Sequence, residues 1–169
     1  MAHFEELNDI NFYIKKTLLD DGDLKKLLFY PEEDALKPSN PIPDDDQIWK
    51  VHMFPMERYV DATTDDKTYL NYFYNMGRNY SSNNSFAYID IVFDIIIYLD
   101  SDEINEGLRR ISILNLIDTK FNEKDLGIGL MDKSYLQGWS ERNYSKNHYG
   151  IRTTYRISLN SNITCINGN

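Results

Sequence analysis

The clearest hydrophobic pattern in the chain is the segment 86–99, which reads FAYIDIVFDIIIYL. It is rich in β-branched and aromatic residues, which favour extended strands over helices. Side chains alternate between the two faces of a strand. One face is then wholly apolar and carries Ile89, Ile91, Phe93, Ile95, Ile97 and Leu99. The other face is mixed and carries Tyr88, Asp90, Val92, Asp94, Ile96 and Tyr98. The segment is predicted to be a long strand.

Apolar residues at spacings of three and four predict helices in two further parts of the chain. Near the N-terminus the pattern indicates helices over about 5–20 and 23–29, and Asp23 is a candidate N-terminal cap for the second. After the long strand a third helix is expected over 102–121, with cap chemistry at residues 101–102. Their apolar stripes can pack on a sheet.

The remaining extended patterns predict more strands. Two short patterns lie within 47–76 around a polar bend, and 77–85 is interpreted as a polar connector. A strand over 128–136, a polar loop over 138–148 and strict alternation over 149–159 together predict a long hairpin.

These patterns predict a single α/β (α+β) domain spanning 1–169, a length that suits one hydrophobic core. Its sheet should be mixed, mostly antiparallel and four- to five-stranded, packed against an amphipathic helix and an N-terminal helical unit. The expected parts are the helical unit over 1–30, an acidic Pro-rich loop over 31–46, the sheet with its helix over 47–159, and a mobile polar tail over 160–169.

Charge excludes some functions. The formal net charge of −9 makes tight or sequence-specific nucleic-acid binding a poor expectation, because such binding is driven by cationic contacts to phosphates. A single cysteine, Cys165, cannot form an internal disulfide, and no apolar run reaches the roughly 20 residues that span a bilayer. We therefore expect a soluble, intracellular protein without a membrane partner.

Catalytic and cofactor chemistry is not indicated. The three histidines, at positions 3, 52 and 148, lack ligand-spaced neighbours, and no phosphate-binding glycine loop or nucleophile elbow occurs. We expect no catalytic residue, cofactor or metal. The one enzymatic alternative is a metal-assisted hydrolase that uses Asp90 and Asp94 with Glu141 or Lys146 nearby.

Asp90 and Asp94 have a second interpretation. Four residues along a strand is about 13 Å at ~3.3 Å per residue, which is too far for two carboxylates to share one ion. Arg152 and Arg156 have the same spacing on the final strand. If the two strands are neighbours, these side chains can pair across the ladder. The salt-bridge ladder is favoured over the metal site.

Charge is also unevenly distributed along the chain. Residues 20–66 hold 13 of the 27 acids, including the run Asp44, Asp45 and Asp46, against 5 of the 18 bases. The stretch from residue 133 to 156 holds five bases and one acid. These bases are Lys133, Arg142, Lys146, Arg152 and Arg156. Segment 31–66 of one copy can therefore meet the basic hairpin of the next copy, as in a head-to-tail ring. Alternatively, the acidic segment covers a basic partner, as in an inhibitor or immunity-type protein.

The order of the elements resembles the tail terminator, or tail completion, proteins of tailed bacteriophages. The resemblance covers residues 86–159 best, and its main stretches read FAYIDIVFDIIIYLDSDEINEGLRRISILNLID and YGIRTTYRISL. The N-terminal stretch LDDGDLKKLLFY, followed by a Pro-containing loop, is also similar to proteins of phage neck and tail modules. The chain departs from the pattern in its longer 31–85 region, so a related neck or connector ring is the alternative within the resemblance.

The resemblance implies a small, non-enzymatic protein with a mixed α/β fold. It implies self-assembly into a hexameric ring in the virion, at the head-proximal end of the tail, after synthesis in the host cytoplasm. The implied partners are further copies of the chain, the tail tube subunit, the neck or connector proteins and, in a contractile tail, the sheath.

Overall fold

The computed structural model describes residues 4–57, 66–80, 83–126 and 131–160, and it has an α+β fold. A five-stranded mixed sheet has the strand order β1-β2-β3-β7-β6. Only β1 and β2 run parallel, and the other neighbours are antiparallel. The strands are β1 (Met53–Phe54), β2 (Tyr69–Tyr80), β3 (Asn83–Tyr98), β6 (Met131–Asn143) and β7 (His148–Asn160). The predicted fold class is confirmed.

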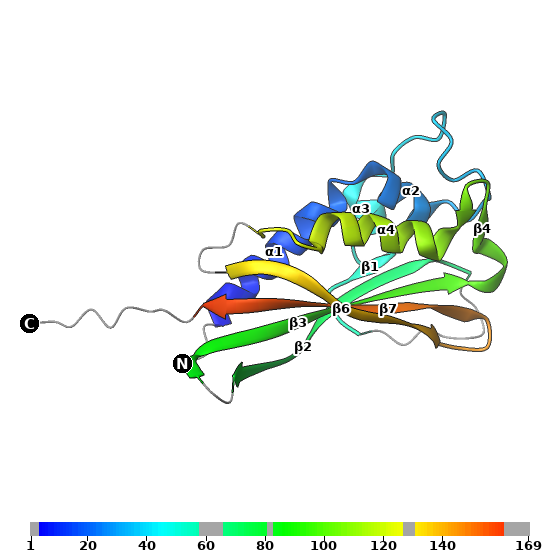
Figure 1. Ribbon diagram of the computed structural model, residues 1–169. Helices are drawn as coiled ribbons and strands as arrows, with labels where there is room; N and C mark the ends of the chain where they lie inside the picture. The colour runs from blue at the N-terminus through cyan, green and yellow to red at the C-terminus, as the bar shows by residue number, and fades with distance from the viewer. Residues whose placement is uncertain (1–3, 58–65, 81–82, 127–130, 161–169) are drawn as a thin grey trace, which may run out of the picture.

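The helices of the described chain all lie on one side of the sheet (Figure 1). They are α1 (Phe4–Leu19), α2 (Gly22–Phe29), α3 (Asp45–Ile48) and α4 (Arg109–Phe121). None of the described helices is both long and apolar enough to cross a bilayer. We call the other side of the sheet the helix-free face.

The core lies between the helices and the face of β3 that the alternation marked as apolar. Ile91, Phe93, Ile95 and Ile97 are fully buried there. The ring of Phe93 lies 5.0 Å from that of Phe121 on α4, between centroids. Burying such side chains contributes about 1.5–3 kcal/mol each. Leu99 is the exception, because β3 ends at Tyr98 and Leu99 is 56% exposed in a short 3₁₀ turn.

The N-terminal helices form as predicted, with a different cap. The carboxylate of Asp21 accepts a hydrogen bond from the Leu24 backbone N–H at 2.8 Å, so Asp21 is the cap of α2. Asp23 lies within the first helical turn instead, where a negative charge interacts favourably with the helix dipole.

The helix predicted over 102–121 starts seven residues later, at Arg109. Residues 103–108 form a small hairpin of β4 (Glu103–Ile104) and β5 (Gly107–Leu108). Gly107 has a φ of 131°, a conformation that a helix does not contain. Asp102 still caps the helix, because its carbonyl accepts from the Arg109 N–H at 2.7 Å and its carboxylate from the Arg110 N–H at 3.0 Å.

The loop predicted over 31–46 is also shorter than expected. Asp45 and Asp46 belong to α3, and the Asp44 N–H donates to Gln47 Oε1 at 2.8 Å at the start of that helix. Acidic residues at a helix start are stabilised by the unpaired N–H groups there. The first of the two short strand patterns expected within 47–76 is reduced to the two residues of β1.

Two predicted connectors are strand instead. The segment 77–85 is largely taken up by β2 and β3, which extend to Tyr80 and from Asn83. The segment 138–148 is largely β6, which continues to Asn143. Backbone pairing with β7 holds this polar strand in place without an apolar alternation. Part of the strand predicted from residue 128, and the tail after Asn160, lie outside the described residues.

Candidate interaction surfaces

Two arginine–carboxylate pairs cross the helix-free face between β3 and β7. Asp94 lies opposite Arg152 and Asp90 opposite Arg156, the arrangement that their equal spacing predicts. Arg152 donates to both oxygens of Asp94 at 2.7 Å each, and Arg156 donates to those of Asp90 at 2.7 and 2.9 Å. Such two-point pairs are geometrically specific. Because both oxygens of each carboxylate contact an arginine, the geometry favours the ladder over a metal site.

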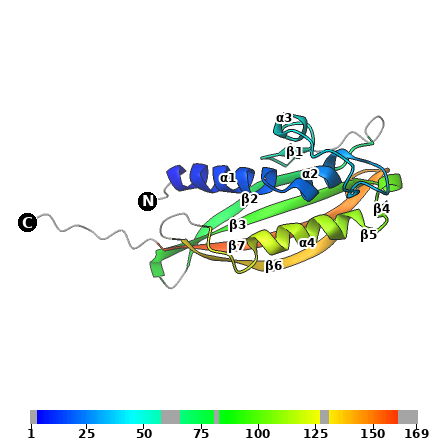
Figure 2. The ribbon, with the colours of Figure 1, turned by 90° about the horizontal axis from the view of Figure 1, so that it is seen from above.

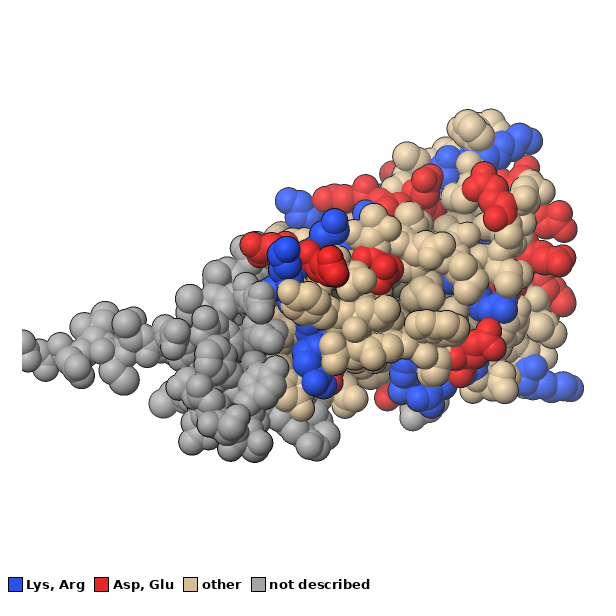
Figure 3. Space-filling model, in the orientation of Figure 1, with Lys and Arg blue, Asp and Glu red and all other residues tan. Residues whose placement is uncertain are grey.

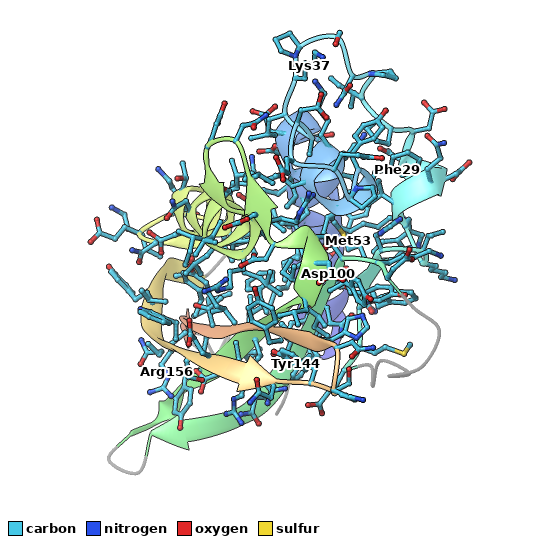
Figure 4. The ribbon with its side chains drawn as sticks, turned by 90° about the vertical axis from the view of Figure 1, so that its right-hand side faces the viewer. Phe29, Lys37, Met53, Asp100, Tyr144 and Arg156 are labelled. Atoms are coloured by element: carbon cyan, nitrogen blue, oxygen red, sulfur yellow. The ribbon has the colours of Figure 1, made fainter. Side chains whose placement is uncertain are left out.

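The Asp94 pair is the more enclosed of the two. The Asp94 side chain is 1% exposed, and the Tyr144 hydroxyl donates to it at 2.9 Å. Tyr144 comes from the turn between β6 and β7 (Figure 4). Arg152 also pairs with Glu57 at 2.7 Å and lies over the ring of Phe73. The hydrogen bonds to Asp94 raise the pKa of Arg152, so this guanidinium stays charged.

Four tyrosine hydroxyls of the described chain, which we call the buried tyrosines, have a raised pKa. Burial is the main cause in each, because removal from water disfavours the phenolate. The nearby carboxylates of Asp94 and Asp118 add to the effect at two of them. The buried tyrosines are Tyr72, Tyr74, Tyr144 and Tyr155.

Sequence reasoning missed Arg109, which is fully buried at the start of α4. Its guanidinium donates five hydrogen bonds, all to backbone carbonyls, at 2.5–2.9 Å. The acceptors are Ser101, Leu27, Tyr30, Pro31 and Glu32. Burial lowers the pKa of Arg109 to about 10, so it remains protonated at neutral pH. Its role is to tie α2 and the loop after it to α4. The sequence around an arginine in an amphipathic helix does not indicate that its side chain is buried or that it binds distant carbonyls.

The basic stretch predicted to contact a second copy is divided by the fold. Arg152 and Arg156 are held in the ladder. Arg142 and Lys146 are exposed at the tip of the β6–β7 hairpin, where they form no ion pair with a described residue. Lys133 lies at the other end of β6 and is exposed. Only the hairpin-tip residues therefore fit the predicted basic patch.

The acidic residues of segment 31–46 occupy two places. The loop after α2 carries acids at the right-hand end of the molecule in Figure 1, the end that also holds the β6–β7 turn. Figure 4 views this end and shows Lys37 of the loop at the top and Tyr144 at the level of the sheet. Figure 3 shows acidic side chains at this end and also along the helical side of the molecule. The run Asp44 to Asp46 lies apart from the loop tip, at α3, where Asp45 pairs with Lys25 and Asp46 is exposed.

Seen from above, α3 and β1 lie along one side of the molecule and β6 along the other (Figure 2). The β6 side exposes Tyr135, Leu136 and Trp139, with 43%, 37% and 58% of their areas accessible. Tyr135 lies on the helix-free face and Leu136 and Trp139 on the other, and the exposure of Trp139 was not predicted, because it falls in the segment interpreted as a polar loop. The position of this tryptophan among polar residues was the feature of the sequence that could have indicated an exposed binding residue.

No group of three or more His, Cys, Asp or Glu side chains in the described part of the chain is arranged to hold a metal. His52 and His148, two of the three histidines, are buried. His52 Nδ1 lies 2.9 Å from the Thr68 carbonyl oxygen, and His148 Nδ1 lies 3.0 Å from Ser145 Oγ. These contacts position turns of the fold.

The structure is that of a small α+β protein with an arginine–carboxylate ladder on its helix-free face and an exposed tryptophan on β6. The chain belongs to the YomW family, whose model matches residues 21–157. The family name suggests a gene product derived from a Bacillus phage, and so a phage origin for the chain. No curated protein matches the sequence.

Proposed function

We propose that this chain is a structural protein of a phage particle. In this proposal several copies, six by resemblance to the tail terminator proteins, form a ring at the head-proximal end of the tail. The ring ends the tail tube and joins it to the neck, and the role requires no catalytic residue or cofactor. Membership of a family with a phage-type name supports the phage setting.

The observation that carries the proposal is the difference between the two sides of the sheet. The side formed by β1 and α3 exposes the acid Asp46, and the side formed by β6 exposes Trp139 and, at its hairpin tip, Arg142. Contacts between two different patches close into a ring when the rotation per subunit allows it. A protein with one self-complementary patch forms a pair instead.

The proposal is tested with the phage that encodes the chain. Deleting the gene should give tails of uncontrolled length that do not join heads, and supplying the protein should restore infectious particles. Normal particles made without the gene would contradict the proposal. Tails of normal length that fail to join heads would instead point to the alternative within the resemblance, a neck or connector ring.

An inhibitor or immunity-type role is the second candidate. Exposed carboxylates on the loop after α2, those of Glu32 and Glu33, favour it because they are available to a basic partner. Affinity capture from the host separates the two roles. An equimolar host enzyme on the captured protein supports inhibition, whereas tail proteins support the structural role.

A further inference from the structure

The outer edge of β6 is covered along only part of its length. At Ser134 the backbone N–H donates to the Lys124 carbonyl at 3.0 Å, and its carbonyl accepts from Glu123 at 2.7 Å. At Leu136 the N–H donates to Asn122 Oδ1 at 3.1 Å. From residue 137 to 143 the described chain supplies no hydrogen bond to the outer side of the strand. We call residues 137–143 the open edge.

The register identifies which backbone groups of the open edge face outward. The pairing of β6 with β7 skips Gln137, because Leu136 lies opposite Tyr155 and Gly138 opposite Thr154. Before this irregularity the outward residues are even-numbered, as Ser134 and Leu136 show. After it they are odd-numbered, because N–H and C=O of alternate residues point to the same side of an antiparallel strand. Trp139, Glu141 and Asn143 therefore present their donors and acceptors outward.

Open edges of this kind are usually protected by proline, by charged side chains, by β-bulges or by a covering segment. The open edge contains no proline, and the covering segment 122–124 stops before it, so its protection is limited to the irregularity at Gln137 and the charges of Glu141 and Arg142. Trp139, 58% exposed, lies on the open edge itself. Exposed tryptophan beside unpaired backbone groups is typical of a binding surface, because tryptophan is enriched at residues that dominate binding energy.

The opposite side of the sheet has a matching gap. β1 pairs only with Leu70 and Asn71, so the rest of β2 has no described strand on its outer side. Beside β1, α3 exposes the carboxylate of Asp46, which has the opposite charge to Arg142 on the open edge. The two sides differ in chemistry and complement each other.

We propose that the open edge of one copy pairs with the outer side of β2 in the next copy, so that the sheet continues from subunit to subunit. Trp139 anchors this contact, and Arg142 meets the acidic residues of α3 in the neighbour. The inference rests on the proposed ring and specifies its subunit contact. Backbone pairing across an interface supplies affinity, and the side chains supply register.

Two exposed-residue variants test the contact, one on each side. The β6 variant carries Trp139→Ser and Arg142→Ser, and the α3 variant carries Asp45→Lys and Asp46→Lys. Phe12→Ser is the matched control for the tryptophan, because Phe12 is 68% exposed on α1. Glu103→Lys with Glu106→Lys is the matched control for the acids, since both are exposed on the β4–β5 hairpin. Thermal unfolding checks that each variant is folded.

Sedimentation measures the mass of each protein alone and of the two variants mixed. We expect rings from the wild type and both controls, and monomers from each variant alone. An equimolar mixture of the two variants should give dimers, because one intact contact remains between them. Any one of four results would overturn the inference. The wild-type protein could stay monomeric, or the β6 variant could keep the wild-type mass. The α3 variant could dimerise alone, or the mixture could stay monomeric.

Hydrogen exchange tests the edge without altering β6. In the wild-type assembly the amides of Trp139, Glu141 and Asn143 should be protected, and in the α3 variant they should exchange rapidly. The amides of Ser140 and Arg142 face β7 and should be protected in both. Equal exchange of the three outward amides in both proteins contradicts the contact. If the contact forms but the gene is dispensable for tails, the proposed function is wrong and the contact is supported. If the gene is required for tails but the contact does not form, the contact is wrong and the proposed function is supported.

Discussion

Replacing Arg109 should remove a large part of the stability of the fold. The guanidinium is completely buried and donates to five carbonyls that come from α2, the loop after it and the turn before α4. Two of these acceptors, Leu27 and Tyr30, belong to the C-terminal end of α2, where carbonyls lack partners within the helix. In Arg109→Met the side chain keeps most of its volume but has no donor.

The expected loss is large because the carbonyls stay buried. A hydrogen bond to a charged group contributes about 1.5–3 kcal/mol, and a buried acceptor left unpaired costs about 1–3 kcal/mol. The five bonds are not additive, because the loop can relax toward water. We therefore expect Arg109→Met to lower the free energy of unfolding by about 4 kcal/mol, out of the roughly 5–15 kcal/mol typical of a domain.

Arg109→Lys distinguishes lost hydrogen bonds from lost volume. Lysine keeps the charge but has three donors at one point, in place of the five donors of the planar guanidinium. Its free energy of unfolding should fall by about 2 kcal/mol, between the wild type and Arg109→Met. Lys16→Met, at an exposed site on α1 outside the proposed subunit contact, is the control and should change it by no more than about 0.5 kcal/mol.

Urea unfolding followed by far-ultraviolet circular dichroism measures these differences through the transition midpoint and slope. A stabilising role for the five hydrogen bonds is ruled out if Arg109→Met unfolds within about 1 kcal/mol of the wild type, or if Arg109→Lys is less stable than Arg109→Met. The first result would mean that the five carbonyls find other partners when the guanidinium is removed. The second would mean that burying a positive charge here costs more than its hydrogen bonds contribute.

Three further outcomes are expected. Stability should fall as the pH rises above about 10, because the unfolded chain releases tyrosine protons there while the raised pKa of the buried tyrosines keeps theirs bound; absorbance at 295 nm and circular dichroism should change together. Gly150→Ala should disrupt the pairing of β3 with β7 and lower the thermal midpoint, since an added Cβ would lie 1.8 Å from the Ile95 carbonyl oxygen. Reversing the charges of Arg152 and Arg156 should destabilise the fold, and reversing Asp90 and Asp94 as well should partly restore it; independent effects in that cycle would remove the ladder.

The elements that were predictable have a strong period and a buried face. The alternation in β3 and β7 and the helical spacing in α1 record directly which side chains face the core. The pairing of Asp94 with Arg152 followed from equal spacing once the two strands were taken as neighbours. The periodic patterns are local in the sequence, and the pairing of the charges needs only the assumption that β3 and β7 are neighbouring strands.

The features that were missed depend on tertiary contacts. β6 is polar along most of its length and forms because β7 supplies its backbone partners. The start of α4 was displaced because Asp102 caps the helix from across a small hairpin. Arg109 acts through carbonyls about 80 residues away in the chain, and Trp139 gains its significance from lying on an uncovered edge. None of these contacts produces a periodic pattern of apolar residues in the sequence.

The most direct test of the proposed role is a three-dimensional reconstruction of purified tails of the phage that encodes this chain. We expect a ring of density at the head-proximal end of the tube, composed of copies of this fold joined through β6 of one copy and the α3 side of the next. A tail end built from other proteins, with this chain absent from the particle, would contradict it.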